Sequence, residues 1–178
     1  MSPQRLRHLV ILAVISSSVG CDQATKVLAI DKLKGQAPME WGPARLAYAE
    51  NPGAFLGMGG EWPPAVRQAV FLIMAGLIVV GGTVWLFRAK RSWPMVLGGA
   101  MFVGGALGNL IDRAFREGGR VVDFAQIDFG IVSTGVFNWA DVLLMAAIPI
   151  FLIWGREDED ADADADAGSP PEPTAAPA

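Results

Sequence analysis

Two aspartates in the last third of the chain, Asp123 and Asp141, have the residue type and spacing for acid–base chemistry. Asn138 precedes Asp141 by three residues, so a helix would place these two side chains on one face. Two carboxylates held close together share one proton, which makes one a base and the other an acid. Such a pair can activate a water against a peptide carbonyl, as in aspartic proteases. A solvated loop aspartate beside a helix-capping aspartate is the plainer interpretation of the same residues.

Three further segments carry polar or small residues that could support such a pair. In the first, Asp22 and Lys26 are four residues apart and share a helical face, where they pair or bind something jointly. The second is an Asn-Pro-Gly turn, and the third is a glycine-rich stretch with a polar end. The candidate residues of these two segments are Asn51, Gly53, Gly105, Gly108, Asn109 and Arg113. Each segment also has a simpler interpretation. The first is an ion pair that orients its helix, the second is a plain turn, and the third is a stretch where helices pack closely.

Composition excludes most other catalytic chemistries. The one cysteine, Cys21, rules out an intramolecular disulfide and a cysteine-rich zinc site. The one histidine, His8, lies beside Arg5 and Arg7 at the N-terminus, which leaves no plausible Ser-His or Cys-His pair. A single histidine also excludes a His-rich metal cluster, so we expect chemistry based on carboxylates, amides, lysine or arginine.

The elements that must position these residues are membrane helices. Of the 178 residues, 52% are apolar and 18% are charged, against about 25% charged in an ordinary soluble domain. Residues 157–178 hold eight of the 18 acidic residues, so the remainder, with 14 basic and 10 acidic residues, has a net charge of +4. The low isoelectric point of the chain, near 4.9, is therefore caused by its acidic tail.

A bilayer core is spanned by about 20 mainly apolar residues in a helix. Residues 68–87 and 92–111 meet this criterion without a charge, residues 137–154 with one charge, and residues 9–30 with two. The sequence therefore predicts an all-α membrane protein with four transmembrane helices and a small β platform in its outer loops.

Basic residues predict the orientation, because Lys and Arg near helix ends stay cytoplasmic. Arg5 and Arg7 precede the first helix, a basic turn joins the second to the third, and Arg156 follows the fourth. Both termini are therefore predicted to be cytoplasmic. The loops at residues 31–66 and 112–136 are predicted to face outward, with the aspartate pair near the outer face.

The outer loops contain the patterns that predict the β platform. Residues 44–49 alternate between tight turns, and residues 120–124 and 126–132 show weaker strand patterns. Residues 1–155 are predicted to form the membrane domain. The acidic, Pro-rich residues 156–178 lack the apolar surface to offset the entropy of ordering and are predicted to be disordered.

The N-terminus also looks like a secretory signal that ends in a lipid-attachment cysteine, Cys21. However, Ser18 occupies the position where a large aliphatic residue is expected, and apolar residues continue beyond Cys21 to Ile30. An uncleaved first transmembrane helix is therefore favoured over a cleaved signal.

Five motifs occur in a fixed order along the chain. They are DQATK (residues 22–26), ENPGAF (residues 50–55), GGALGNLIDR (residues 104–113), VVDF (residues 121–124) and FNWAD (residues 137–141). In this order, and in a four-helix chain, they resemble bacterial lipoprotein signal peptidase, also called signal peptidase II. One departure is an outer-loop motif that is one residue shorter before its aromatic than the family's Asn-x-Gly-Ala-Ala-Phe, which affects Ala54 and Phe55.

The resemblance implies an inner-membrane aspartic endopeptidase that removes signal peptides from prolipoproteins, cleaving before the diacylglyceryl-modified cysteine. Asp123 and Asp141 would be its catalytic pair. The residues implied to bind substrate or support the pair are Asp22, Lys26, Asn51, Gly53, Gly105, Gly108, Asn109, Arg113 and Asn138. The implied partners are lipid-modified prolipoproteins and membrane lipid, with no nucleic acid, metal or organic cofactor.

Two other function classes stay open at this point. A small transporter or channel component could relay protons or an ion through Asp22, Lys26, Asp123 and Asp141. Inverted repeats or interrupted helices would favour that function, and the sequence shows neither. A scaffold protein could dock through its acidic tail. Deletion of residues 157–178 distinguishes it, because a peptidase would keep its activity.

Overall fold

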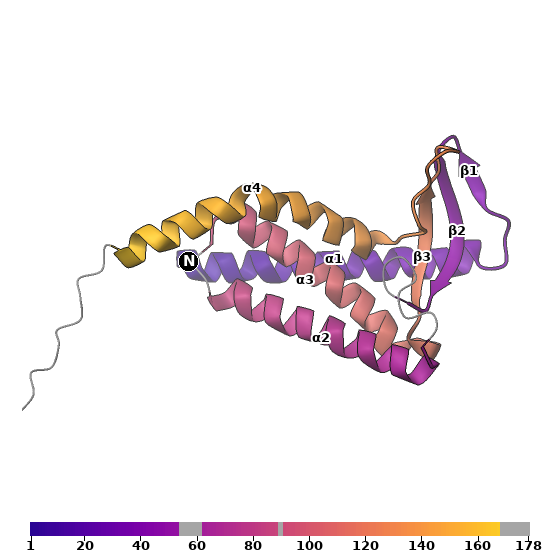
Figure 1. The fold of residues 1–178 in the computed structure, drawn as a ribbon, viewed down its shortest axis with the longest axis horizontal. Coiled ribbons are helices and arrows are strands. Elements are labelled where there is room, and N and C mark those ends of the chain that lie inside the picture. The colour runs from indigo at the N-terminus through magenta and orange to yellow at the C-terminus, as the bar shows by residue number, and fades with distance from the viewer. Residues whose placement is uncertain (54–61, 89–90, 168–178) are drawn as a thin grey trace, which may run out of the picture.

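Four long helices and a small sheet make up the protein, and the computed structural model describes residues 1–53, 62–88 and 91–167. The helices are α1 (Pro3–Leu33), α2 (Pro64–Arg88), α3 (Trp93–Phe115) and α4 (Trp139–Ala167). They form a bundle, and the sheet lies across one end of it, here called the sheet end (Figure 1). All four helices are long and apolar enough to cross a membrane. The predicted multi-pass membrane architecture with a small sheet is confirmed.

The helix boundaries differ from the predicted spans for local reasons. α1 begins at Pro3 because Ser2 caps it, accepting a hydrogen bond from the Arg5 backbone N–H at 3.3 Å. α4 continues to Ala167, whereas the sequence predicted a helix end at residue 154 and disorder from residue 156. Alternating alanines, which have the highest helix propensity, are compatible with this extension. Residues 168–178 lie outside the described part, and the domain boundary after residue 155 stays a prediction.

α3 packs against each of the other three helices. Its glycines allow this close approach. A Cβ atom on Gly104 would lie 2.5 Å from the Ser18 Cβ of α1, and one on Gly99 would lie 2.7 Å from the Trp85 ring of α2. One on Gly98 would lie 2.8 Å from the Ile150 side chain of α4. The glycine-rich stretch therefore does pack helices closely, as glycines in membrane helices commonly do.

Two apolar clusters hold the elements together. The first lies within the bundle and consists of Ile11, Leu86, Val96, Ala100 and Val103. The second joins the C-terminal end of α1 to the sheet and consists of Ala29, Leu33 and Val122. The second cluster fixes the sheet against the end of α1, so the strands are positioned by the same helix that carries Asp22 and Lys26.

The sheet contains β1 (Met39–Trp41), β2 (Ala44–Asn51) and β3 (Val121–Ile127) in the antiparallel order β1-β2-β3. β2 confirms the strand predicted at residues 44–49. A short 3₁₀ helix, η2 (Glu117–Gly119), connects α3 to β3. The outer-loop strands therefore bring residue 51 beside residue 121, within two positions of Asp123.

The two weak strand patterns of the second loop prove to be one strand. β3 covers residues 121–127, and only a single bridge, between Asp128 and Ser133, lies in the predicted second strand. Gly130 in this bend has a positive φ of 81°, a conformation that side chains disfavour and that ends the strand pattern. The weak pattern at residues 126–132 therefore does not form a separate strand. β1 was not predicted.

Candidate active site

Asp123 and Asp141 meet at the sheet end, where β3 passes the first turn of α4. Asn138 joins them through two donors: its side-chain Nδ2 donates to Asp123 Oδ1 at 2.6 Å, and its backbone N–H donates to Asp141 Oδ2 at 3.1 Å. Asp123 is 2% exposed and Asn138 is 1% exposed. The structure thus brings together the two carboxylates that the sequence placed in separate motifs.

The first turn of α4 is fixed by a reciprocal pair of hydrogen bonds. Asn138 Oδ1 accepts from the Asp141 backbone N–H at 3.1 Å, while Asp141 Oδ2 accepts from the Asn138 backbone N–H. This is the arrangement of a capping box, with Asn138 as the cap of a helix that begins at Trp139. The two side chains therefore share a cap rather than the predicted helical face.

Two further amides complete the hydrogen bonding of the dyad, the pair formed by Asp123 and Asp141. Asn51 Nδ2 donates to Asp123 Oδ2 at 3.1 Å, and Asn109 Nδ2 donates to Asp141 Oδ1 at 3.0 Å. Asn51 is itself held by a turn, because its Oδ1 accepts from the Gly53 backbone N–H at 3.0 Å. Each carboxylate oxygen of the dyad therefore accepts an N–H donor.

Burial gives Asp123 an unusual protonation equilibrium. Loss of solvent around the carboxyl is the main cause, and the neighbouring Asp141 carboxylate the second, of a rise in the pKa of Asp123 from 3.8 to about 6. The hydrogen bonds from Asn138 and Asn51 oppose this shift. A carboxyl with a pKa near 6 exchanges its proton readily at neutral pH, as acid–base chemistry requires.

Lys26 lies behind the dyad at the centre of a buried ion cluster. Its ammonium is 2.8 Å from Asp22 Oδ2, 3.1 Å from Asp112 Oδ2 and 3.0 Å from Asn109 Oδ1. Lys26 and Asp22 are both 0% exposed. Asp22 Oδ1 also accepts from the Ala140 backbone N–H at 3.0 Å. The residues predicted to share a face of the first helix thus form an ion pair that reaches the residue next to Asp141.

Asp112 was missed as a supporting residue. Asp112 contacts Lys26 of α1 at 3.1 Å and Arg116, four residues further along the chain, at 2.9 Å. Its Oδ2 also accepts from the Val122 backbone N–H at 3.1 Å. An acidic residue directly after the predicted span of residues 92–111 was the available signal. Asp112 therefore anchors the strand next to Asp123.

Gln23 was also missed, although it lies in the DQATK motif between the two charged residues. Its Nε2 lies within hydrogen-bond distance of three acceptors: Asp22 Oδ2 at 3.0 Å, the Gly108 carbonyl at 3.1 Å and Asp112 Oδ1 at 3.3 Å. Nothing in its type or spacing distinguished it from a surface amide.

Arg113 binds the outer loop rather than the dyad. Its guanidinium donates to the Gly53 carbonyl at 2.7 Å and to the Gly119 carbonyl at 3.2 Å, and it lies 5.1 Å from the centroid of the Phe71 ring. A planar fork suits two divergent carbonyls better than an ammonium does. Arg113 thus fixes the segment that carries Asn51.

The two predicted glycines let the helices approach beneath this polar network. A Cβ atom on Gly108 would lie 2.5 Å from Asp22 Oδ2, and one on Gly105 would lie 2.7 Å from the Ala140 carbonyl. Both contacts are closer than real Cβ atoms make. Ala54 and Phe55 of the shortened motif lie outside the described residues. Among residues 1–53, 62–88 and 91–167, no cluster of His, Cys, Asp and Glu is suited to a metal.

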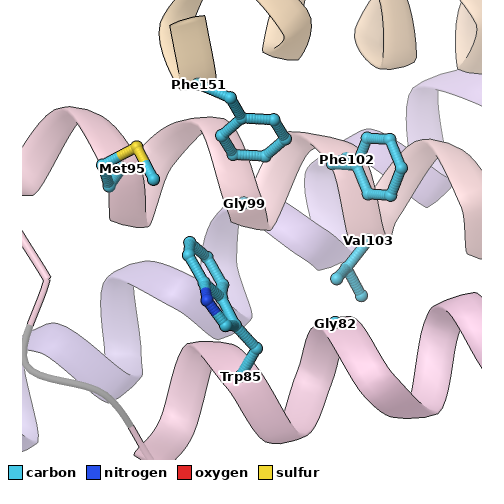
Figure 2. A pocket seen from close by; sticks show the side chains of 7 residues that line it. All are labelled: Gly82, Trp85, Met95, Gly99, Phe102, Val103 and Phe151. Atoms are coloured by element: carbon cyan, nitrogen blue, oxygen red, sulfur yellow. The ribbon is translucent and has the colours of Figure 1, made fainter. Parts of the chain in front are cut away.

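A second feature of the bundle, an apolar pocket of about 250 Å³, lies away from the dyad among α2, α3 and α4. Figure 2 shows the side chains of Trp85, Met95, Phe102 and Phe151 around the backbone of Gly99. Its lining offers no ionisable group, so we assign no chemistry to it.

The chain is similar in sequence to proteins named lipoprotein signal peptidase from several bacteria. It is 36% identical to that of Leifsonia xyli subsp. xyli over 167 residues, covering 85% of this chain and 71% of the relative. It is 34% identical to that of Desulforapulum autotrophicum over 151 residues, covering 82% and 91%.

The fold is similar to solved bacterial membrane enzymes. One, determined by the in meso method at 2.3 Å, has a TM-score of 0.68 and 22% identity, covering 92% of this chain and 93% of that chain. Another, determined at 1.9 Å, has a TM-score of 0.69 and 21% identity, covering 81% and 90%. Residues 14–155 match the family described as signal peptidase (SPase) II. The chain therefore belongs to the signal peptidase II family, the lipoprotein signal peptidases.

Proposed function

We propose that the protein is an aspartic endopeptidase that removes the signal peptide from prolipoproteins by cleaving before their lipid-modified cysteine. The observation that carries this proposal is the pair of carboxylates, Asp123 and Asp141, held by one asparagine at the end of a membrane bundle. Family membership supplies the substrate class. It also favours this function over a proton or ion relay.

In the proposed reaction Asp141 is the ionised member of the pair. It lies in the first turn of α4, where the helix dipole and the backbone N–H of Asn138 stabilise a negative charge. Asp123 carries the shared proton, and its raised pKa supports this assignment. The asymmetry gives one base and one acid from two residues of the same type.

The chemical steps follow from that assignment. Asp141 takes a proton from a water as the water oxygen bonds to the scissile carbonyl carbon, while the Asp123 proton passes to the carbonyl oxygen. The resulting tetrahedral diol collapses when its carbon–nitrogen bond breaks. The proton held by Asp141 passes to the leaving amine, and a hydroxyl proton of the diol returns to Asp123. Both carboxyls are thereby restored.

The location we propose is the inner membrane, with both termini cytoplasmic and the dyad near the outer face. In the structure the N-terminus and the C-terminal end of α4 both lie opposite the sheet (Figure 1). Basic residues gather at that end, which supports a cytoplasmic orientation. At the outer face, where the dyad lies in this orientation, the acyl chains of the substrate remain in lipid while its peptide bond reaches the polar groups. A reporter fused after Trp154 should report cytoplasm, and one inserted at residues 116–119 should report the outside.

The direct test is cleavage by the purified protein in lipid bilayers. We expect loss of the signal peptide from a diacylglyceryl-modified prolipoprotein, with the new N-terminus at the modified cysteine. The matched control is the same precursor with that cysteine replaced by serine, which cannot be modified and should stay intact. Cleavage at another bond, or equal cleavage of both precursors, would contradict the proposal.

A further inference from the structure

The side-chain amide of Asn109 has a fixed orientation, because each of its ends faces partners of one kind. Its Oδ1 accepts from Lys26 Nζ at 3.0 Å and from Asn138 Nδ2 at 3.1 Å, while its Nδ2 donates to Asp141 Oδ1 at 3.0 Å. An ammonium offers three donors and no acceptor. A flipped Asn109 would place N–H groups against an ammonium and oxygen against a carboxylate.

The amide of Asn138 cannot fix Asn109 without help. Asn138 is oriented by the Asp141 backbone N–H, which donates to its Oδ1 and leaves its Nδ2 for Asp123 and Asn109. That supplies one donor to Asn109 Oδ1. Lys26 supplies the other donor, and it is the only charged one of the two. Hydrogen bonds from charged donors are roughly twice as strong as neutral ones. Lys26 is therefore the stronger of the two donors that hold the oxygen end of Asn109.

Lys26 is also tied to the backbone beside each catalytic aspartate. Through Asp22 it reaches the N–H of Ala140, which precedes Asp141. Through Asp112 it reaches the N–H of Val122, which precedes Asp123. The ammonium is completely buried, and its three donors have three acceptors. Of the three groups that Lys26 contacts, Asn109 bonds to the dyad directly, and Asp22 and Asp112 each bond to the backbone N–H of the residue before a dyad aspartate.

We propose that Lys26 is a positioning residue of the proteolytic reaction: it holds Asn109 in the orientation that donates to Asp141 and so keeps Asp141 the ionised base of the dyad. This inference rests on the proposed function. Lys26 acts through Asn109 and does not itself touch substrate. A lysine that served only to join helices would stabilise the fold without affecting which carboxyl holds the proton.

The test measures kcat/KM for prolipoprotein cleavage against pH for the parent and for Lys26→Met. Loss of the oriented donor makes ionisation of the base harder, so the midpoint of the acidic limb should move to higher pH by about one unit. The rate at the optimum should fall by about a hundredfold, the scale of a misplaced reacting group. A lower rate with unmoved midpoints would overturn the proposal.

Other charged groups around the dyad must be considered in that profile. They are Asp22 on α1, Glu50 on β2, Asp112 and Arg113 on α3, and Arg116 directly after α3. The one histidine, His8, lies at the opposite end of α1, so midpoints near neutral pH report carboxyls. Thr25→Val is the matched control, because Thr25 precedes Lys26 on α1 and its hydroxyl donates to the Cys21 and Asp22 backbone carbonyls of the same helix. It should leave both midpoints at their parent values.

Two further variants separate orientation from charge and from misfolding. Lys26→Met combined with Asp22→Asn removes one charge of each sign, so it tests orientation even where the single variant does not fold. Its acidic midpoint should still be raised, and parent midpoints would overturn the proposal. In an Asn109→Ala background, adding Lys26→Met should move the midpoint no further, because both changes interrupt one path. If the parent enzyme fails to cleave, the proposed function fails instead.

Discussion

α3 approaches its neighbours through glycines at both ends of the bundle, but the neighbours differ. Away from the sheet, Gly98 and Gly99 face the apolar side chains of Ile150, Trp85 and Leu86. At the sheet end, by contrast, the nearest atoms to two other α3 glycines are a carboxylate and a backbone carbonyl. The same backbone device therefore supports an apolar packing region in one place and a buried polar network in the other.

The two regions should respond differently to change. The stability of the apolar region depends on how well its side chains fit together, and its pocket of about 250 Å³ shows that this fit is incomplete (Figure 2). The polar network depends on complete pairing, because an unpartnered buried charge or amide is costly. A substitution in the apolar region should therefore alter stability alone. A substitution in the polar network should alter activity as well.

The largest effect is expected from the dyad. Asp123→Asn or Asp141→Asn keeps the shape but cannot exchange a proton, so cleavage should fall by about a thousandfold or more. The measurement is the rate of signal-peptide release by folded protein in bilayers. Asp128→Asn, which changes a loop aspartate bonded to the Gly130 backbone, is the matched control and should retain near-parent rates. Near-normal turnover by either dyad variant would remove it from the chemistry.

A smaller but still large effect is expected at Arg113. Arg113→Lys keeps the charge and loses the fork that holds the Gly53 and Gly119 carbonyls, so Asn51 should shift relative to Asp123. A displacement of about 1 Å costs on the order of a hundredfold in rate. Arg120→Lys, at a half-exposed arginine on the same side of the molecule, should change the rate little. A rate for Arg113→Lys within about twofold of the parent, well under 1 kcal/mol of barrier, would contradict this role.

Substitution of Gly108 in the polar network and of Gly99 in the apolar region compares the two regions directly. Gly108→Ala would push Asp22 away from Lys26 and should lower both the melting temperature and the rate per folded molecule, the latter by about tenfold. Gly99→Ala would press on Trp85 and Leu86 and should cost about 1–3 kcal/mol of stability, with the rate per folded molecule retained. Equal losses of rate in both variants would erase the distinction between the regions.

Local spacing predicted those parts of the site that lie on one element. The four-residue separation of Asp22 and Lys26 predicted a shared helical face, with an ion pair as one of two alternatives, and the structure has the ion pair. The motif order also named the two aspartates that the fold brings together. The contact of Asp112 with Lys26 could not be predicted, since the two residues lie 86 positions apart in the sequence.

The start of α4 shows how tertiary contacts override a local pattern. Apolar character predicted a helix from residue 137, but the Phe137 backbone exchanges hydrogen bonds with Ala125 of β3 at 2.7 and 2.9 Å. This pairing keeps Phe137 out of the helix and leaves Asn138 as its cap. Asn138 and Asp141 therefore form a helix cap and do not share a helical face. Their spacing of three residues is compatible with either arrangement.

A further prediction concerns pH-dependent stability at the sheet end. Folding raises the pKa of Asp123 from 3.8 to about 6, so the folded protein binds more protons than the unfolded chain between these values. The free energy of unfolding should therefore fall as pH rises from about 4 to 6, by up to about 3 kcal/mol. Asp123→Asn lacks this dependence, so its melting temperature should gain on that of the parent between pH 4 and 7. A constant difference across that range would refute the burial argument.

The smallest effect is expected from deletion of the tail. Removal of residues 157–178 takes away eight of the 18 acidic residues and leaves in place the asparagines that donate to Asp123 and Asp141. Long-range charge effects between exposed groups fade beyond about 10 Å at ordinary salt, so cleavage should stay within about twofold of the parent. The measurement is signal-peptide release at matched protein level in low and high salt. A large loss of cleavage would indicate that the tail docks a partner required for activity, and would favour the scaffold function over an autonomous peptidase.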